Sequence, residues 1–201
     1  PCSATPPEQL GAAVDGVDLK NPLGPLRKSL SELRRLWLDH AVWYHHPHYI
    51  AHLNCPISAA AVAGDAIASA VNTAVESWDQ ASSAALIEQK LLHWLCEKLQ
   101  WPAAGSHGAF TSGGTQSNLQ ALLIARNKTL AIHGYDALPR LCILHTADTH
   151  YSVARASNTL GLHPTTGSRV VETDAHHRMS PTALDEALAE CARDGLIPMA
   201  I

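Results

Sequence analysis

The stretch RLCILHTADTHYSVARASNTLG, residues 140–161, joins a short apolar run to a helical pattern through a polar loop. The run RLCILHT at 140–146, with LCIL at its centre, predicts a short strand. The pattern at 152–160 predicts a helix, and Gly161 follows at the position where helices commonly end. Residues 140–161 therefore predict the first strand and helix of an α/β unit.

The segments that follow repeat this order. SRVVET at 168–173 predicts a second strand, and LIPMAI at 196–201 predicts a third. The helix predicted between them has Ser180 as its N-cap, Pro181 in its first turn and Gly195 after its end. Strands that alternate with helices indicate an α/β fold with an at least partly parallel sheet. Because a parallel strand is normally covered by later elements, we expect this sequence to be part of a larger chain or the remainder of the sheet to be a separate polypeptide.

The first half of the sequence predicts mainly helices. Leu26, Leu30, Leu33 and Trp37 recur at helical spacing within a helix expected at 26–43. Further helices are expected at 58–72 and from Ser82 or Ser83 to about Gln100, with an irregular leader before them and a connector at 76–85. We expect two parts: an N-terminal leader and helical segment at 1–57, and an incomplete α/β domain at 58–201.

Composition excludes several classes of protein. The chain has 201 residues, of which 46% are hydrophobic and 16% charged, so we expect a packed core. The net charge of -4 without a basic run argues against nucleic-acid binding. No apolar stretch is long enough for a membrane span, and the N-terminus does not resemble a signal peptide. Five widely spaced cysteines without a CxxC pair favour reduced thiols in a cytoplasmic protein.

GAFTSGGTQSNLQALLIARN at 108–127 places small and hydroxylated residues directly before a helix expected at 117–128. Gly113 and Gly114 carry no side chains, so the backbone is open to a ligand, and the helix N-terminus favours an anion. Thr115 and Ser112 supply hydroxyl donors. The alternative is an ordinary loop with Ser117 or Thr115 as the helix N-cap. The spacing differs from GxxxxGK[ST], so a nucleoside-triphosphate loop is disfavoured.

Histidines form the other candidate groups. His150 lies between a predicted strand and a helix, at the sheet edge where ligands of α/β proteins bind. It is placed to stack on a flat ring or to handle protons, although a solvent-exposed loop histidine fits the same position. HHPHYIAH at 45–52 contains four histidines, but Pro47 breaks the helical spacing and no carboxylate completes a ligand set. We therefore expect no metal site.

Taken together, these segments resemble the group II pyridoxal-5'-phosphate-dependent amino-acid decarboxylases. The resemblance rests on HPHYIAHLNCP, ESWDQASSAALIEQKLLHWL, GAFTSGGTQSNLQALLIAR, HYSVARASNTLGL and DAHHRMSPTALDEAL, which occur in the family's order. The elements TSGGTxxN and HxS are the most specific, and AHLNCP is most similar to the diaminobutyrate branch. The resemblance implies the incomplete large domain of fold type I, the aspartate-aminotransferase-like fold, in a homodimer that decarboxylates an L-amino acid.

The resemblance also implies roles for individual residues. Gly113, Gly114 and Thr115 would hold the phosphate of pyridoxal 5'-phosphate (PLP), and His150 would stack on the pyridine ring as a catalytic residue. The substrate would be bordered by a further group of three: His52, Asn54 and Cys55.

One part of the family's pattern is missing from these residues. The family's cofactor-binding lysine and the aspartate that pairs with the pyridine nitrogen both lie further along the chain than Ile201. The five lysines here stand outside that motif: Lys20, Lys28, Lys90, Lys98 and Lys128. We therefore expect these 201 residues to be inactive alone. Another fold-type-I enzyme, such as an aminotransferase or a cysteine desulfurase, and a non-catalytic module that lost its lysine remain alternatives.

Overall fold

The computed structural model describes residues 4–50, 53–102 and 104–201. The chain divides into two compact units, Pro1–Gln89 and Lys90–Ile201. The expected boundary at residue 57 between a leader and the α/β domain stays a prediction.

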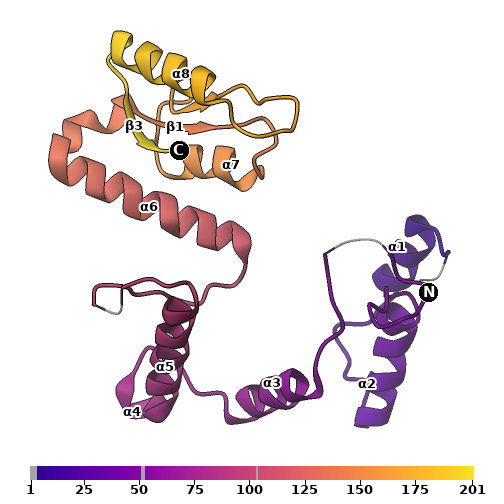
Figure 1. Cartoon of the computed structure of the whole chain (residues 1–201). Helices are drawn as coiled ribbons and strands as arrows, with labels where there is room; N and C mark the ends of the chain where they lie inside the picture. The colour runs from indigo at the N-terminus through magenta and orange to yellow at the C-terminus, as the bar shows by residue number, and fades with distance from the viewer. Residues whose placement is uncertain (1–3, 51–52, 103) are drawn as a thin grey trace. The chain divides into compact units, whose positions relative to one another are not determined.

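The second unit contains a parallel three-stranded sheet (Figure 1). Its strands are β1 (Leu141–His145), β2 (Ser168–Val170) and β3 (Ile197–Ala200), in the order β2-β1-β3. Both neighbours run parallel to β1, and a register shift lies between Cys142 and Ile143 on the β3 side. The predicted α/β class and the parallel sheet are confirmed for this unit.

Helices cover both faces of the sheet, as Figure 1 shows for α7 and α8 on either side of β1. Leu141 and Ile143 pack with residues of α6 (Gly114–His133) and α7 (Ser152–Thr159) in one buried cluster. Cys142 and Leu144, which alternate with them along β1, pack against α8 (Pro181–Arg193) in a second cluster. Successive strand residues point to opposite faces, so the apolar run Leu141–Leu144 of β1 serves two cores.

The helix boundaries of this unit follow local signals. The Ser180 hydroxyl accepts a hydrogen bond from the Ala183 N–H, so the predicted N-cap of α8 is confirmed. Gly161 follows Leu160, the C-cap of α7, with a φ of 73°, a left-handed conformation in which glycine is favoured. A 3-10 helix, η2 (Tyr135–Arg140), connects α6 to β1.

The first unit is helical. Its elements are α1 (Pro7–Asp15), α2 (Leu26–Leu33), the π-helix η1 (Arg34–Leu38), α3 (Ala59–Val71), α4 (Trp78–Ala81) and the start of α5 (Ser83–Lys98). The expectation of an irregular leader was wrong at α1, where Pro7 occupies the first helical turn and favours the helix. The connector expected at 76–85 likewise contains the short helix α4, and the helix expected at 26–43 ends at Leu38. No helix in the described ranges is both long enough and apolar enough to cross a membrane.

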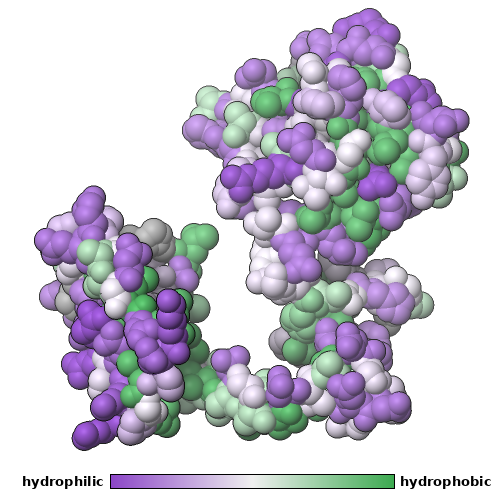
Figure 2. Space-filling model, turned by 180° about the vertical axis from the view of Figure 1, so that it is seen from behind, coloured by the Kyte–Doolittle hydropathy of each residue, from purple (hydrophilic) through white to green (hydrophobic). Residues whose placement is uncertain are grey.

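Large apolar side chains remain exposed on this unit. The helical stripe predicted from the sequence is 44–73% exposed: Leu26, Leu30, Leu33 and Trp37. Figure 2 shows hydrophobic residues, in green, on the surface of these N-terminal helices. The apolar pattern therefore forms the expected helices without covering their apolar faces inside this unit.

The cysteines differ in their accessibility. Cys142 and Cys191 are fully buried with their Sγ atoms 3.7 Å apart, whereas Cys55 is exposed. Burial, and next the hydrogen bond with Cys191, raises the pKa of the Cys142 thiol to about 12.

We expect iodoacetamide at neutral pH to alkylate Cys55 and to spare Cys142 and Cys191, because the thiolate is the nucleophile. Peptide mass spectrometry after a short reaction measures the labelling of each site. The same reaction in guanidinium chloride serves as the control and should label all three. Modification of Cys142 in the folded protein would contradict its burial.

Candidate functional site

The candidate phosphate site lies at the first turn of α6. The helix begins at Gly114 with Gly113 as its N-cap, three residues earlier than expected, and no side chain caps it. Neither Ser117 nor Thr115 takes the N-cap role that the ordinary-loop alternative assigned to them. In the described part of the chain, no group accepts a hydrogen bond from the N–H groups of residues 114–116. A 20-residue helix therefore presents free donors and the positive end of its dipole.

Neighbouring polar side chains hold the turn in place. The Ser112 N–H and hydroxyl both donate to Oε1 of Gln116, at 2.9 and 2.7 Å. The Thr111 hydroxyl donates to the Gly113 carbonyl at 3.1 Å and also meets the Ser117 hydroxyl at 2.6 Å. Ser112, which the sequence offered as a donor to an anion, is thus already used within the loop.

The space before the turn is open. A Cβ built on Gly113 or Gly114 meets no other atom within 4 Å, and Thr115 makes no side-chain hydrogen bond to the described residues. Free N–H groups, a free hydroxyl and the absence of side chains at both glycines fit a phosphate group. The residues present therefore suit the phosphate of PLP, and their assignment stays a prediction.

His150 lies in the loop that follows β1. The chain leaves β1 toward β2 on one side and returns to β3 on the other, so the carboxyl end of β1 is a topological switch point. The Thr149 hydroxyl accepts a hydrogen bond from the Thr146 N–H, and the Thr149 N–H donates to the Thr146 carbonyl, both at 3.1 Å. This turn places His150 at the edge where the sequence predicted a ligand.

The ring of His150 has a neighbour on one side. The Tyr151 ring lies 4.3 Å away between centroids with an angle of 33° between the planes, and Arg155 lies 4.6 Å over that same tyrosine. His150 itself is exposed. A tilted partner of this kind covers one face of the imidazole and leaves the other for a flat ligand ring.

A hydrogen-bonded chain connects the two candidate regions. Asn118 Nδ2, on the second turn of α6, donates to Ser152 Oγ at 2.8 Å, and Ser152 Oγ lies 2.7 Å from His150 Nδ1. The structure therefore brings the α6 turn and His150 to the same edge of the sheet. Sequence reasoning missed Asn118 and Ser152 as functional residues, although they are the last residues of TSGGTxxN and HxS.

A second contact holds the loop that carries Asp148 and His150. His177 has a φ of 59° and its Nδ1 lies 3.0 Å from Oδ2 of Asp148. The turn that carries His177 is held by Asp174, whose pKa is lowered by hydrogen bonds from the backbone and then the side chain of Arg178. Both members of the His177–Asp148 pair are exposed, so the contact orients the loop more than it stabilises the fold.

The predicted substrate residues are in the first unit. His52 lies outside the described residues. Asn54 and Cys55 are both exposed, and Cys55 is a free thiol. Their proximity to the substrate stays a prediction.

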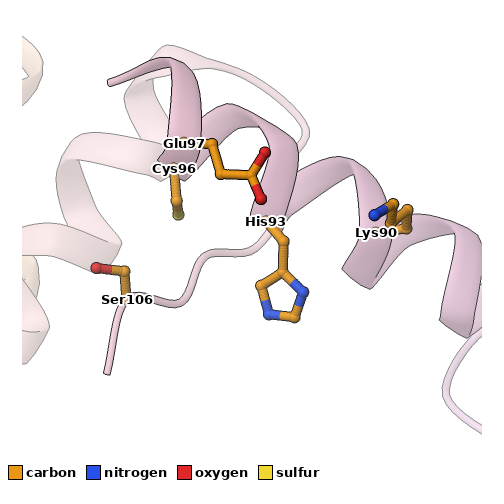
Figure 3. Close-up of a pocket in the computed structure, with 5 residues that line it drawn as sticks. All are labelled: Lys90, His93, Cys96, Glu97 and Ser106. Carbon is orange, nitrogen blue, oxygen red and sulfur yellow. The ribbon is translucent and has the colours of Figure 1, made fainter. Parts of the chain in front are cut away.

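Two hollows of the second unit are lined by described residues. One of about 410 Å³ lies behind the phosphate turn, between residues 107–111 and the side of α6 that carries Ser117 and Ile124. Figure 3 shows the other, of about 270 Å³, lined by Ser106 and four side chains of α5: Lys90, His93, Cys96 and Glu97. In Figure 3 these side chains spread along the helix instead of meeting at one point. Among the described residues, no three His, Cys, Asp or Glu side chains are grouped to hold a metal ion.

The sequence of this chain is similar to the sequences of one group of enzymes. Residues 17–201 match the family described as the pyridoxal-dependent decarboxylase conserved domain. An L-2,4-diaminobutyrate decarboxylase of Rhizobium meliloti (strain 1021) is 36% identical over 200 residues, covering 99% of this chain and 39% of that protein. A protein of the same name from Acinetobacter baumannii is 28% identical, and the match covers 94% of this chain and 40% of that protein. The chain thus spans about two-fifths of these relatives.

Solved structures give the same result. The glutamate decarboxylase domain of diaminobutyrate-pyruvate transaminase and L-2,4-diaminobutyrate decarboxylase from Vibrio parahaemolyticus has a TM-score of 0.89 and 36% identity. It matches 98% of this chain and 45% of that one. Oryza sativa TDC with PLP and tryptamine has a TM-score of 0.85 and 27% identity, over 98% and 42% of the two chains. These likenesses confirm the predicted fold class, part of a fold-type-I large domain.

Proposed function

Because the chain belongs to the pyridoxal-dependent decarboxylase family, we propose that it carries the phosphate-binding and ring-stacking part of an enzyme that decarboxylates an L-amino acid. The observation that carries this proposal is the uncapped, open turn of α6 joined to His150 through Asn118 and Ser152. When bound, PLP supplies the electron sink that loss of carbon dioxide from an amino acid requires.

The protein's own residues bind and orient the cofactor. The N–H groups of residues 114–116 and the Thr115 hydroxyl donate to the phosphate, and the missing side chains of Gly113 and Gly114 allow its approach. His150 presents the ring face opposite Tyr151 to the pyridine ring. The phosphate anchor and the stacked ring together set the position of the cofactor in the site.

The proposed substrate is L-2,4-diaminobutyrate, which two similar proteins carry in their names. His52, Asn54 and Cys55 are proposed to border it. None of the five lysines stands in the family's cofactor-binding motif, so we expect no turnover from residues 1–201 alone.

We also propose a homodimer in the cytoplasm. The exposed stripe on α2 and η1, from Leu26 to Trp37, supports an apolar contact with a second subunit. The free thiols of the four described cysteines support a reducing compartment.

Carbon dioxide release tests the function. The protein at its natural full length, loaded with PLP, should convert L-2,4-diaminobutyrate to 1,3-diaminopropane and carbon dioxide in equal amounts. L-Glutamate and an aromatic amino acid serve as comparison substrates for specificity. Formation of a keto acid without carbon dioxide would instead support an aminotransferase, and no product from any amino acid would support the non-catalytic alternative.

A further inference from the structure

His150 has two hydrogen-bonding ring nitrogens, and the structure treats them differently. Nδ1 lies 2.7 Å from the Ser152 hydroxyl and accepts a hydrogen bond from the Ser152 backbone N–H at 3.3 Å. No described residue makes a hydrogen bond with Nε2 of His150. The backbone contact is long, so the hydroxyl at 2.7 Å is the stronger partner of Nδ1, and a hydroxyl that donates to Nδ1 places the proton of the neutral ring on Nε2.

The environment of Ser152 leads to the same assignment. Its side chain is buried, with 1% of the residue exposed, and its hydroxyl can donate one proton. Asn118 Nδ2 donates to this oxygen at 2.8 Å, so the hydroxyl proton has to point elsewhere. His150 Nδ1 is the one other side-chain partner of Ser152 Oγ in the described chain. Protonation of Nδ1 would leave the buried Ser152 hydroxyl proton without an acceptor, which is costly.

We propose that Asn118 and Ser152 are positioning residues that hold the His150 ring as the tautomer with its proton on Nε2. Asn118 directs the Ser152 hydroxyl, and Ser152 directs the imidazole. Ser152 lies at the start of α7 and Asn118 lies three residues after Thr115 on α6. The orientation of the stacking ring is therefore tied to the helix that bears the phosphate turn.

The proposal has a structural and a kinetic consequence. The ring keeps one N–H donor, Nε2, on the edge away from Ser152. The other nitrogen, Nδ1, is an acceptor whose hydrogen bond is already made by Ser152. The kinetic consequence rests on the proposed decarboxylase function, because it needs His150 to act beside the cofactor. The tautomer itself does not rest on that function and is measurable without PLP.

The test combines ¹⁵N NMR of histidine side chains with kinetics of the full-length protein. Long-range ¹H–¹⁵N spectra of the PLP-free protein at mildly alkaline pH show which ring nitrogen carries the proton, and His150→Gln identifies the signals. Two nearly isosteric variants alter the hydrogen bonds that connect Asn118, Ser152 and His150. Ser152→Ala removes the hydroxyl. Asn118→Asp replaces the amide donor by a carboxylate, to which the Ser152 hydroxyl donates instead of donating to His150.

Wild-type His150 should show an unprotonated Nδ1. Both variants should shift the ring toward protonation at Nδ1 and lower kcat about tenfold, with KM changed less than about twofold. Loss of the hydrogen-bond partner behind a metal-binding histidine costs about 10- to 100-fold, and we expect the lower end of that range for a histidine without a metal. A protonated Nδ1 in the wild type, or an unchanged tautomer in both variants, would overturn the proposal.

Matched controls separate positioning from general damage. Ser157→Ala removes a buried hydroxyl of the same helix α7, which donates to the Ala154 carbonyl. Asn127→Asp makes the same charge change at an exposed position of α6. Both should keep the wild-type tautomer and kcat. If the wild type shows the predicted tautomer but decarboxylates no amino acid, the proposed function fails and the positioning role stands.

Discussion

Gly114→Asp should weaken PLP binding at least about 100-fold without unfolding the protein. The new carboxylate would stand at the first residue of α6, where the phosphate is proposed to bind, and two like charges within about 4 Å repel by several kcal/mol at a protein surface. The same carboxylate stabilises the free helix, because it interacts favourably with the positive end of the dipole. Cofactor affinity and thermal stability should therefore change in opposite directions.

Titration of the PLP-free full-length protein, followed by absorbance of the bound cofactor, measures the dissociation constant, and calorimetry measures Tm. Gly114→Ala is the matched control, since an added Cβ meets no atom of the described chain within 4 Å. Its Cβ takes part of the space proposed for the phosphate, so it should weaken PLP binding, but much less than the carboxylate of Gly114→Asp does. If Gly114→Asp bound PLP as tightly as Gly114→Ala does, the phosphate would not lie at this turn.

His150→Ala should lower kcat/KM for decarboxylation about 100- to 1,000-fold. The variant loses both the ring that stacks on the cofactor and the Nε2 donor, and a positioned proton-handling group typically contributes a factor of this size. His150 makes no contact with the buried apolar clusters, but its loss leaves the buried Ser152 hydroxyl without an acceptor, so the free energy of unfolding should fall by about 1–3 kcal/mol. Carbon dioxide release from the preferred amino acid is the measurement.

A second substitution separates the contribution of ring stacking to activity from that of the Nε2–H donor. His150→Phe keeps a flat ring, so PLP affinity should stay within about threefold of the wild type while kcat remains low. His133→Ala, at an exposed position at the end of α6, is the control and should be fully active. An activity of His150→Ala within twofold of the wild type would remove His150 from the catalytic residues.

The parts of the fold that were predicted well are those whose signals are local. An apolar run of four residues identifies β1, and Ser180 and Gly161 mark helix ends through their own conformation and hydrogen bonds. These signals involve residues close together in the chain, so the sequence of strands and helices in the second unit is readable without a structure.

The missed or shifted boundaries have a common cause. The start of α6 was predicted three residues late because Gly113 and Gly114 suit a loop and a helix start equally well, and no side-chain cap marks the choice. Helix α1 was missed because its glycine and the prolines before it resemble a leader, although Pro7 fits a first helical turn. Local composition does not decide between such alternatives.

The sequence by itself determined the α/β order, the small-residue turn before α6 and the histidine after β1, since each depends on neighbouring residues. Only the tertiary structure decided that these features share one edge of the sheet. Asn118 and Ser152 are 34 positions apart, and the parallel sheet with its crossover helix brings them within 2.8 Å. Hydrogen bonds between distant residues depend on how the helices pack on the sheet, and packing is a property of the whole fold.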